Sequence, residues 1–193
     1  MKIILASRSP RRQELLREAG YTVEVIPPQE TAECGRSSGE TPDAMAARLA
    51  YQKAADVAAR IDHGLIVACD TIVECGGQIM GKPAGEDHAR QMLCALRGQQ
   101  HRVLSGLCVW KKPGEARVRV AETLLVMDPL SDAQLEEYIA SGAWEGKAGA
   151  FGYQDRLGWV HVIHGSESNV VGLPMELLAE MIGELGAAEA AGC

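Results

Sequence analysis

GLIVACDTIVEC, residues 64–75, is a continuous apolar run of strand character. The glycine pair at 76–77 ends it with a turn, and QIMGKP at 78–83 returns as a short strand or loop. Asp70 interrupts the run at its middle, where an ionised carboxylate is costly unless it is paired, binds a metal or faces a cleft. Asp70 is therefore a candidate site residue; the alternative is an aspartate that caps a turn at a strand end.

Helical patterns lie on both sides of this strand. Residues 42–61 open with Thr41-Pro42, and residues 85–98 stop at Gly98. Both carry apolar residues at three- and four-residue spacing, which predicts amphipathic helices. The residues expected on the inner faces are Met45, Leu49, Ala50, Ala54 and Val57 in the first helix, and Ala89, Met92, Leu93 and Leu96 in the second.

The remaining patterns alternate between strands and helices. Strands are expected at 21–26, 101–112, 116–128 and 158–165, and helices at 10–19, 132–141 and 172–185. Because hairpin pairs occur among interleaved helices, we predict an α/β fold with a mixed sheet flanked by helices. A chain of 193 residues without internal repeats suits one domain at 1–185, and its Ala/Gly-rich tail at 186–193 is expected to fray.

The first turn of the first helix is unusually basic. Ser9 is a good N-cap, Pro10 suits the first helical position, and Arg11 and Arg12 follow. These arginines oppose the helix dipole, whereas an anion at the helix N-terminus would be stabilised. The stretch is therefore either an anion site or an ordinary surface turn with solvated arginines.

Charge and composition exclude several classes of protein. The net charge of −7 disfavours DNA or RNA as a partner and makes a basic cluster informative. No apolar run approaches the roughly 20 residues that span a bilayer, and residues 1–10 lack the features of a signal peptide. Six cysteines contain no C-x-x-C pair, which disfavours a zinc ribbon or a redox motif. We expect a soluble, cytosolic protein.

Further polar residues suit a phosphate ester. Lys82 lies in the stiff GKP turn and is equally well explained as a solvent-facing lysine. Lys53 lies among apolar residues, where a lysine is more often a surface residue with a buried stem than a ligand. In KAGAFGYQD, small residues permit close backbone approach and Gln154 offers an amide that can read a base edge. The segment GSESNVVGLP, 165–174, is a second small-residue turn that opens onto a helix.

Seven motifs follow one another along nearly the whole chain: LASRSPRR, ETP with ARLA and KA, CDTIV, GKP, ML..LRG..H.V.SG, KAGAFGYQ and SNVVGLP. In this order they resemble the Maf family of nucleoside triphosphate pyrophosphatases. The resemblance implies a fold like that of inosine triphosphate pyrophosphatases, with a cleft between two lobes. It also implies hydrolysis of a nucleoside triphosphate to the monophosphate and pyrophosphate with a divalent metal, Mg²⁺ or Mn²⁺.

The resemblance assigns roles to residues of these motifs. Ser7, Arg11 and Arg12 would hold the triphosphate, and Lys53 and Lys82 would contact phosphates. The resemblance implies that Asp70 is the catalytic acid/base and a metal ligand. It also implies a second metal ligand in the loop after the second strand, which is Glu33 or, as the alternative, Glu30.

Base preference depends on three residues of the resemblance. Arg11, Thr71 and Gln154 together resemble the subgroup that hydrolyses dTTP and UTP more than the 7-methyl-GTP subgroup. The family pattern YxIQG reads FGYQD here, so Asp155 stands in place of the glycine. This departure leaves base specificity open.

Two other classes of function remain. One is a nucleotide-binding regulator of cell division that senses dTTP or UTP without turnover; intact Asp70 argues against it. The other, a plain phosphatase or kinase, lacks a P-loop and an organised nucleophile. The resemblance also implies a homodimer, which nothing in the spacing tests.

Overall fold

The computed structural model describes residues 1–30, 39–155 and 157–191, with the backbone alone for 188–191. In these residues seven strands form one sheet in the order β2-β1-β3-β5-β6-β7, with β4 paired to β3. The strands are β1 (Lys2–Leu5), β2 (Thr22–Val25), β3 (Gly64–Cys75), β4 (Gln78–Met80), β5 (Gln100–Lys112), β6 (Ala116–Met127) and β7 (Val160–His164). β1 pairs in parallel with β2 and β3, and the other pairs are antiparallel. The expected mixed sheet is confirmed.

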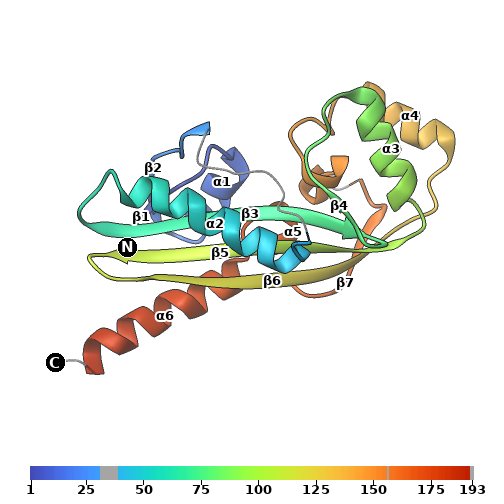
Figure 1. Ribbon diagram of the computed structural model, residues 1–193. Helices are drawn as coiled ribbons and strands as arrows, with labels where there is room; N and C mark the ends of the chain where they lie inside the picture. Colours follow the sequence, from blue (N-terminus) through green and yellow to red (C-terminus); the bar gives the residue numbers. More distant parts are fainter. Residues whose placement is uncertain (31–38, 156, 192–193) are drawn as a thin grey trace.

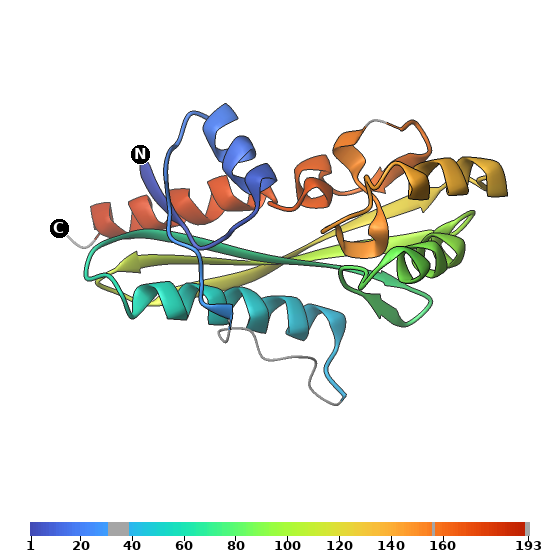
Figure 2. The ribbon, with the colours of Figure 1, turned by 90° about the horizontal axis from the view of Figure 1, so that it is seen from above.

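Helices cover both faces of this sheet (Figures 1 and 2). The helices are α1 (Pro10–Glu18), α2 (Pro42–Ala58), α3 (Glu86–Leu96), α4 (Asp132–Ala140), α5 (Glu167–Val171) and α6 (Met175–Ala191), with short 3₁₀ turns η2 (Ala148–Ala150) and η3 (Tyr153–Asp155). The expected flanking of the sheet by helices is therefore confirmed as well.

Alternation along the strands explains the two covered faces. On β3, Val67 and Cys69 pack with residues of α1 and α6, whereas Ile66 and Ala68 pack with α2. Successive side chains of a strand point to opposite faces, so an apolar strand covered on both sides reads as a continuous apolar run. The run at 64–75 is such a strand.

The molecule has two lobes that share the long strands β3, β5 and β6 (Figures 1 and 2). The first lobe contains β1, β2, α1, α2 and α6. The second contains β4, α3, α4, η2 and β7 around its own cluster, in which Leu93, Leu96 and Leu125 are fully buried.

An opening in the sheet separates the lobes. β5 pairs with one edge of β3 from Gly64 to Glu74. On the other edge, β1 pairs only at Ile66 and Val67, and β4 only from Val73 onward. Residues 68–72 lie between, and no described strand pairs with this edge there. Asp70 and Thr71 are therefore on the part of β3 that borders the opening.

Most expected elements are present, with instructive differences. Ser9 is the N-cap of α1, but its side chain makes no capping hydrogen bond. The short elements α5, η2 and η3 were not predicted, because three to five residues carry too little periodicity. α6 continues to Ala191, into the expected tail; fraying of that tail stays a prediction.

Burial follows the predicted inner faces closely. Ala89, Met92, Leu93 and Leu96 are all buried on α3. On α2, Met45 is only half-buried.

Cysteines 69, 75, 94 and 108 are free, and two of them, at 69 and 108, are buried. Within the described residues, no helix combines the length and the apolar character needed to cross a membrane.

Candidate active site

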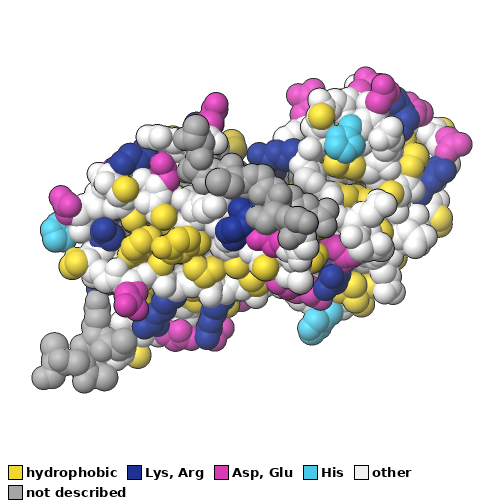
Figure 3. Space-filling view, viewed as in Figure 1, with side chains coloured by type: hydrophobic (Ala, Val, Ile, Leu, Met, Phe, Trp, Pro, Cys, Tyr) yellow, Lys and Arg dark blue, Asp and Glu magenta, His cyan; other side chains and the backbone are white. Residues whose placement is uncertain are grey.

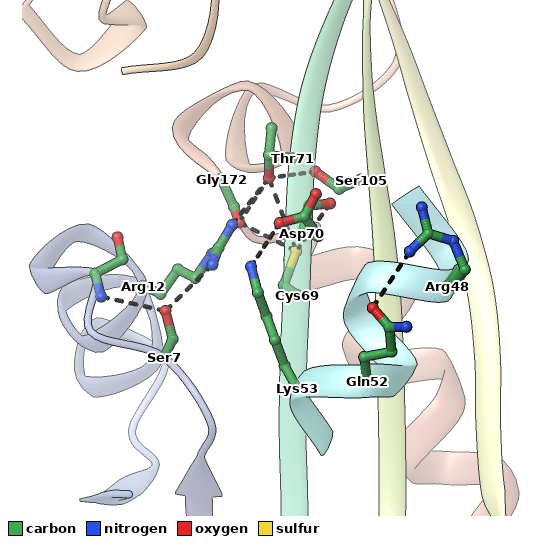
Figure 4. A network of polar contacts seen from close by, with 11 residues as sticks. Ser7, Arg12, Arg48, Gln52, Lys53, Cys69, Asp70, Thr71, Ser105 and Gly172 are labelled. Carbon is green, nitrogen blue, oxygen red and sulfur yellow. Dashed lines mark hydrogen bonds and ion pairs between the residues drawn. The ribbon is translucent and has the colours of Figure 1, made fainter. Parts of the chain in front are cut away.

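Asp70 and Lys53 form a buried ion pair beside the opening in the sheet. The Lys53 Nζ lies 2.5 Å from the Asp70 Oδ1, and the two side chains are 9% and 13% exposed. Figure 4 shows Lys53 reaching from α2 toward Asp70 on β3. Two alternatives from the sequence are therefore wrong: Asp70 lies within β3 and does not cap a turn at its end, and Lys53 is not a surface lysine.

A glycine opposite Asp70 lets α2 approach the sheet. Gly106 on β5 is the register partner of Asp70. A Cβ at position 106 would lie 2.0 Å from the carbonyl oxygen of Ala46 on α2. Lys53 lies about two helical turns beyond Ala46. The close contact of α2 with β5 therefore determines how far α2 lies from the sheet, and so how far Lys53 must extend to contact Asp70.

Arg12 ties three separate segments together. Its Nε donates to the Gly172 carbonyl at 2.7 Å, its Nη1 to the Ser7 Oγ at 3.2 Å and its Nη2 to the Thr71 Oγ1 at 3.1 Å (Figure 4). The Thr71 Oγ1 lies 2.8 Å from the Ser105 Oγ. The guanidinium is thereby fixed in orientation by the loop between β1 and α1, by β3 and by the end of α5, as a bidentate anion ligand requires.

Two adjoining cavities open between the lobes. The central cavity, of about 60 Å³, is lined by Arg11, Arg12, Thr71, Lys82 and Lys147, among others. The outer cavity, of about 590 Å³, is lined by Ser7, Arg8, Arg11, Arg12, Glu30, Lys53 and Lys82, among others. In Figure 3, basic side chains lie at the hollow between the two lobes.

The central cavity is strongly basic. Four cationic side chains line it, and no described carboxylate does. Burial lowers the pKa of Arg11, and the neighbouring Arg12 lowers it further, while Asp155 and Tyr138 act in the opposite direction. Like charges held this close favour an anionic ligand, because such a ligand relieves their repulsion.

Gln154 lies outside these two cavities. It is exposed on η3 and lines a side cavity of about 680 Å³, together with Tyr153, Glu14, Glu167 and others. Arg11 lines this side cavity as well as the other two. Of the other predicted substrate-binding residues, the described structure places only Arg11 in the same cavity as Gln154, and Arg11 connects this cavity with the two basic ones.

A family model described as "Maf-like protein" matches residues 2–185. The dTTP/UTP pyrophosphatase of Rhodopirellula baltica is 55% identical over 182 residues, covering 93% of this chain and 80% of that protein. The chain belongs to the Maf family. Two more relatives with the same name, from Dehalococcoides mccartyi and Sphingopyxis alaskensis, are each 41% identical, covering 96% and 95% of this chain and 83% and 96% of those proteins.

The matches among solved structures are more distant. The Staphylococcus aureus Ham1 protein has a TM-score of 0.46 at 12% identity, covering 67% of this chain and 73% of that one. A Coxiella burnetii HAM1 protein has a TM-score of 0.43 at 14% identity, covering 67% of this chain and 74% of that one.

For this Maf-family chain, most residues predicted to bind substrate meet around the opening. Ser7, Arg11, Arg12, Lys53 and Lys82 all line the outer cavity. Lys82 is exposed there, whereas Ser7 is buried. Thr71 lines the central cavity, and Asp70 adjoins the outer one through its contact with Lys53.

Of the two candidate loop acids, Glu33 and Glu30, the structure describes one. Glu33 lies outside the described residues. Glu30 lines the outer cavity but is exposed, with its Oε1 3.2 Å from the Nη1 of Arg8. The choice between them stays a prediction.

Asp70 is the predicted metal ligand that lies within the described residues. The described His, Cys, Asp and Glu side chains form no group of three or more that could hold a metal ion. Mg²⁺, however, is commonly bound by one or two carboxylates with substrate phosphates and waters. Asp70 fits such a partial site, because its carboxylate adjoins a cavity whose basic lining suits phosphates.

The sequence did not single out Ser105, Gly172 or Lys147, and it marked Asp155 only as a departure from the family pattern. Ser105 and Gly172 lie within two of the motifs, but their contacts with Thr71 and Arg12 join segments far apart in the chain. Lys147 and Asp155 stand at the two ends of KAGAFGYQD. Their opposite charges, eight residues apart in a glycine-rich turn, were a signal for an ion pair.

Proposed function

We propose that this protein hydrolyses dTTP and UTP to the nucleoside monophosphate and pyrophosphate. The observation that carries the proposal is the position of Asp70 and Lys53 beside cavities lined by Arg11, Arg12 and Lys82. The relatives named dTTP/UTP pyrophosphatase, of which one is 55% identical, support the choice of nucleotide.

In the proposed mechanism the first turn of α1 and its surroundings bind the triphosphate. The N-terminus of α1 carries free N–H groups and a partial positive charge, and Arg11 and Arg12 follow at once. Ser7 orients Arg12 through its hydroxyl. The exposed Lys82 lines the same cavity and adds a positive charge from the other side of the opening. The phosphate chain therefore lies across the opening in the sheet.

Asp70 is the proposed general base. Its carboxylate takes a proton from a water that attacks the α-phosphorus, and pyrophosphate leaves as an anion stabilised by the surrounding cations. The ion pair with Lys53 orients the carboxylate and compensates for its burial. When bound, a divalent cation, Mg²⁺ or Mn²⁺, held by Asp70 with Glu33 as a second ligand, would neutralise charge on the phosphates.

We assign recognition of the base to the side cavity. Gln154 offers both a donor and an acceptor, which suits the edge of thymine or uracil. Arg11 lines this cavity and the two basic ones, so one nucleotide can reach both. Thr71 contributes indirectly by holding Arg12.

The proposed enzyme has one domain and a free nucleotide as its partner. We propose that residues 1–185 form one domain, since β3, β5 and β6 run through both lobes. The free nucleotide is the expected partner, with neither a nucleic acid polymer nor a membrane. A homodimer and a cytoplasmic location stay predictions.

A turnover panel tests the function. The purified protein is incubated with magnesium and dTTP, UTP, CTP, dATP, dGTP or 7-methyl-GTP, and monophosphate with pyrophosphate is resolved from diphosphate with phosphate. Asp70→Asn is assayed beside Asp62→Asn, the same change at an exposed aspartate. We expect pyrophosphate from dTTP and UTP, a loss of about a hundredfold or more in Asp70→Asn, and no loss in Asp62→Asn.

Other outcomes identify the alternatives. Turnover of 7-methyl-GTP in preference to dTTP would contradict the subgroup. Saturable binding of dTTP without any turnover would overturn the enzyme and favour a nucleotide sensor.

A further inference from the structure

A second ion pair lies at the wall of the central cavity that the second lobe provides. Lys147, just before η2, lines this cavity with Arg11, Arg12 and Lys82. Its Nζ is bound to the Oδ2 of Asp155 on η3, and the two side chains are 11% and 21% exposed. Neither residue has a role in the proposed mechanism, although Lys147 faces the same cavity as the phosphate-binding groups.

The surrounding residues make room for this pair. A Cβ at Gly152 would lie 2.5 Å from both the Asp155 Oδ2 and the Lys147 Nζ. The Asp155 amide donates to the Gly152 carbonyl at 3.2 Å, and the Tyr138 hydroxyl on α4 lies 3.4 Å from the Asp155 Oδ2. The carboxylate is thus held by a tight turn and by a helix of the second lobe, and the ammonium rests on it.

The charges around the cavity give Asp155 a function. Arg11, Arg12, Lys82 and Lys147 line the cavity without a described carboxylate among them. Burial and then the charge of Arg12 lower the pKa of Arg11, whereas the charge of Asp155 raises it. The negative charge of Asp155 therefore reaches beyond Lys147 and partly neutralises the cation cluster from behind.

We propose that Lys147 binds a phosphate group in the central cavity and that Asp155 is its counter-ion when no ligand is present. An anionic ligand in the central cavity, which Lys147 lines, then competes with Asp155 for the Lys147 ammonium. The inference rests on the proposed function only for the class of ligand, a chain of phosphates.

Binding of inorganic pyrophosphate tests the inference without any turnover. Calorimetry gives the Kd for the wild type, Lys147→Met, Asp155→Asn and the double variant. Losing a charged hydrogen-bond donor should raise the Kd of Lys147→Met about tenfold. Removing the competing carboxylate should lower the Kd of Asp155→Asn about threefold. In the double variant the Asp155→Asn effect should vanish, because it acts through Lys147.

Matched variants separate binding from folding. Lys2→Met removes a lysine from a surface ion pair with Glu24, outside the central cavity, and should leave the Kd unchanged. Lys147→Arg keeps the positive charge and should retain most of the affinity for pyrophosphate. A lysine with a purely structural role would not explain this retention. Thermal unfolding of each variant identifies any that fails to fold, and Asp155→Asn and Lys147→Arg then carry the test.

Two results would overturn the inference. One is a Kd in folded Lys147→Met within twofold of the wild type. The other is weaker binding in Asp155→Asn, which would make the carboxylate a support for Lys147 and not its competitor. Either result leaves dTTP hydrolysis by the wild type untouched, and absent hydrolysis with Lys147-dependent binding of pyrophosphate would overturn the proposed function alone.

Discussion

Two lysines of the candidate site differ sharply in their surroundings. Lys53 is buried against Asp70, whereas Lys82 is exposed at the rim. Removing one partner of a buried ion pair leaves an uncompensated charge, so Lys53→Met should lower the free energy of unfolding by about 3 kcal/mol. It should also reduce kcat, because Asp70 loses the group that orients it. Urea denaturation and dTTP turnover measure the two effects.

Lys82→Met is the matched variant for this prediction. The same loss of a lysine charge at an exposed position should change the free energy of unfolding by less than about 0.5 kcal/mol. It should raise the KM for dTTP and leave the unfolding midpoint in place. Equal destabilisation by both variants would contradict the burial of the Lys53–Asp70 pair.

At the level of elements, the packing of α2 on the sheet depends on one glycine. In Gly106→Ala the new methyl group would lie 2.0 Å from the Ala46 carbonyl oxygen, so α2 must move outward. We expect a loss of about 3 kcal/mol in the free energy of unfolding. Turnover should fall as well, since α2 carries Lys53. Chemical denaturation and kcat test this.

Gly183 on α6 provides the opposite case. Nothing lies within 4 Å of a Cβ built there, and the residue is inside a helix. Gly183→Ala should therefore stabilise the protein by about 0.5–1 kcal/mol. Two results would contradict this explanation, in which the close contact with Ala46 determines the cost of Gly106→Ala. One is a lower free energy of unfolding in Gly183→Ala, and the other is an unchanged free energy of unfolding in Gly106→Ala.

Glu74, near the C-terminal end of β3, should make the free energy of unfolding depend on pH. Burial alone would raise the pKa of Glu74, but hydrogen bonds from Arg102 and the Gly77 amide outweigh it and hold the pKa below the ordinary 4.5. A lowered carboxyl pKa in the folded state adds stability above the unfolded value, and this stability is lost as the pH falls through the folded value. Glu74→Gln should thus destabilise at neutral pH and much less in acid.

Urea midpoints at pH 7 and about pH 3 check the dependence. The exposed Glu115→Gln serves as the comparison and should match the wild type at both values. An equal loss for Glu74→Gln at both pH values would mean that its ionised hydrogen bonds are not the source of stability.

At the scale of the whole molecule, local patterns predicted the elements but not the opening between them. The apolar run of β3 and the inner face of α3 could be identified within single segments. The opening at 68–72 could not, because it depends on how few residues of β1 and β4 pair with β3.

The site shows the same division. Asp70 stood out because a carboxylate in an apolar run needs a partner. Its contact with Lys53 depends on the height of α2 above the sheet, which Gly106 determines. The Lys147–Asp155 pair likewise depends on the turn around Gly152, so its place at the cavity could not be read from spacing.

The charge distribution of the molecule predicts a salt effect. The chain carries a net charge of −7, yet its central cavity is lined by four cations. Attraction of a triphosphate to this local patch is screened by salt. We expect kcat/KM for dTTP to fall about tenfold from low salt to about 0.5 M KCl, with kcat little changed. Sucrose at equal osmolality is the control, and a salt-independent kcat/KM would contradict the role of the cavity.

In the proposed mechanism, water activated by Asp70 attacks the α-phosphorus of a nucleoside triphosphate bound across the opening. Hydrolysis of dTTP in water enriched in the heavy isotope of oxygen, followed by mass spectrometry of the products, tests it most directly. We predict that the label enters dTMP and that the pyrophosphate is unlabelled. Label in pyrophosphate, or release of labelled inorganic phosphate, would place the attack on another phosphorus and contradict the account.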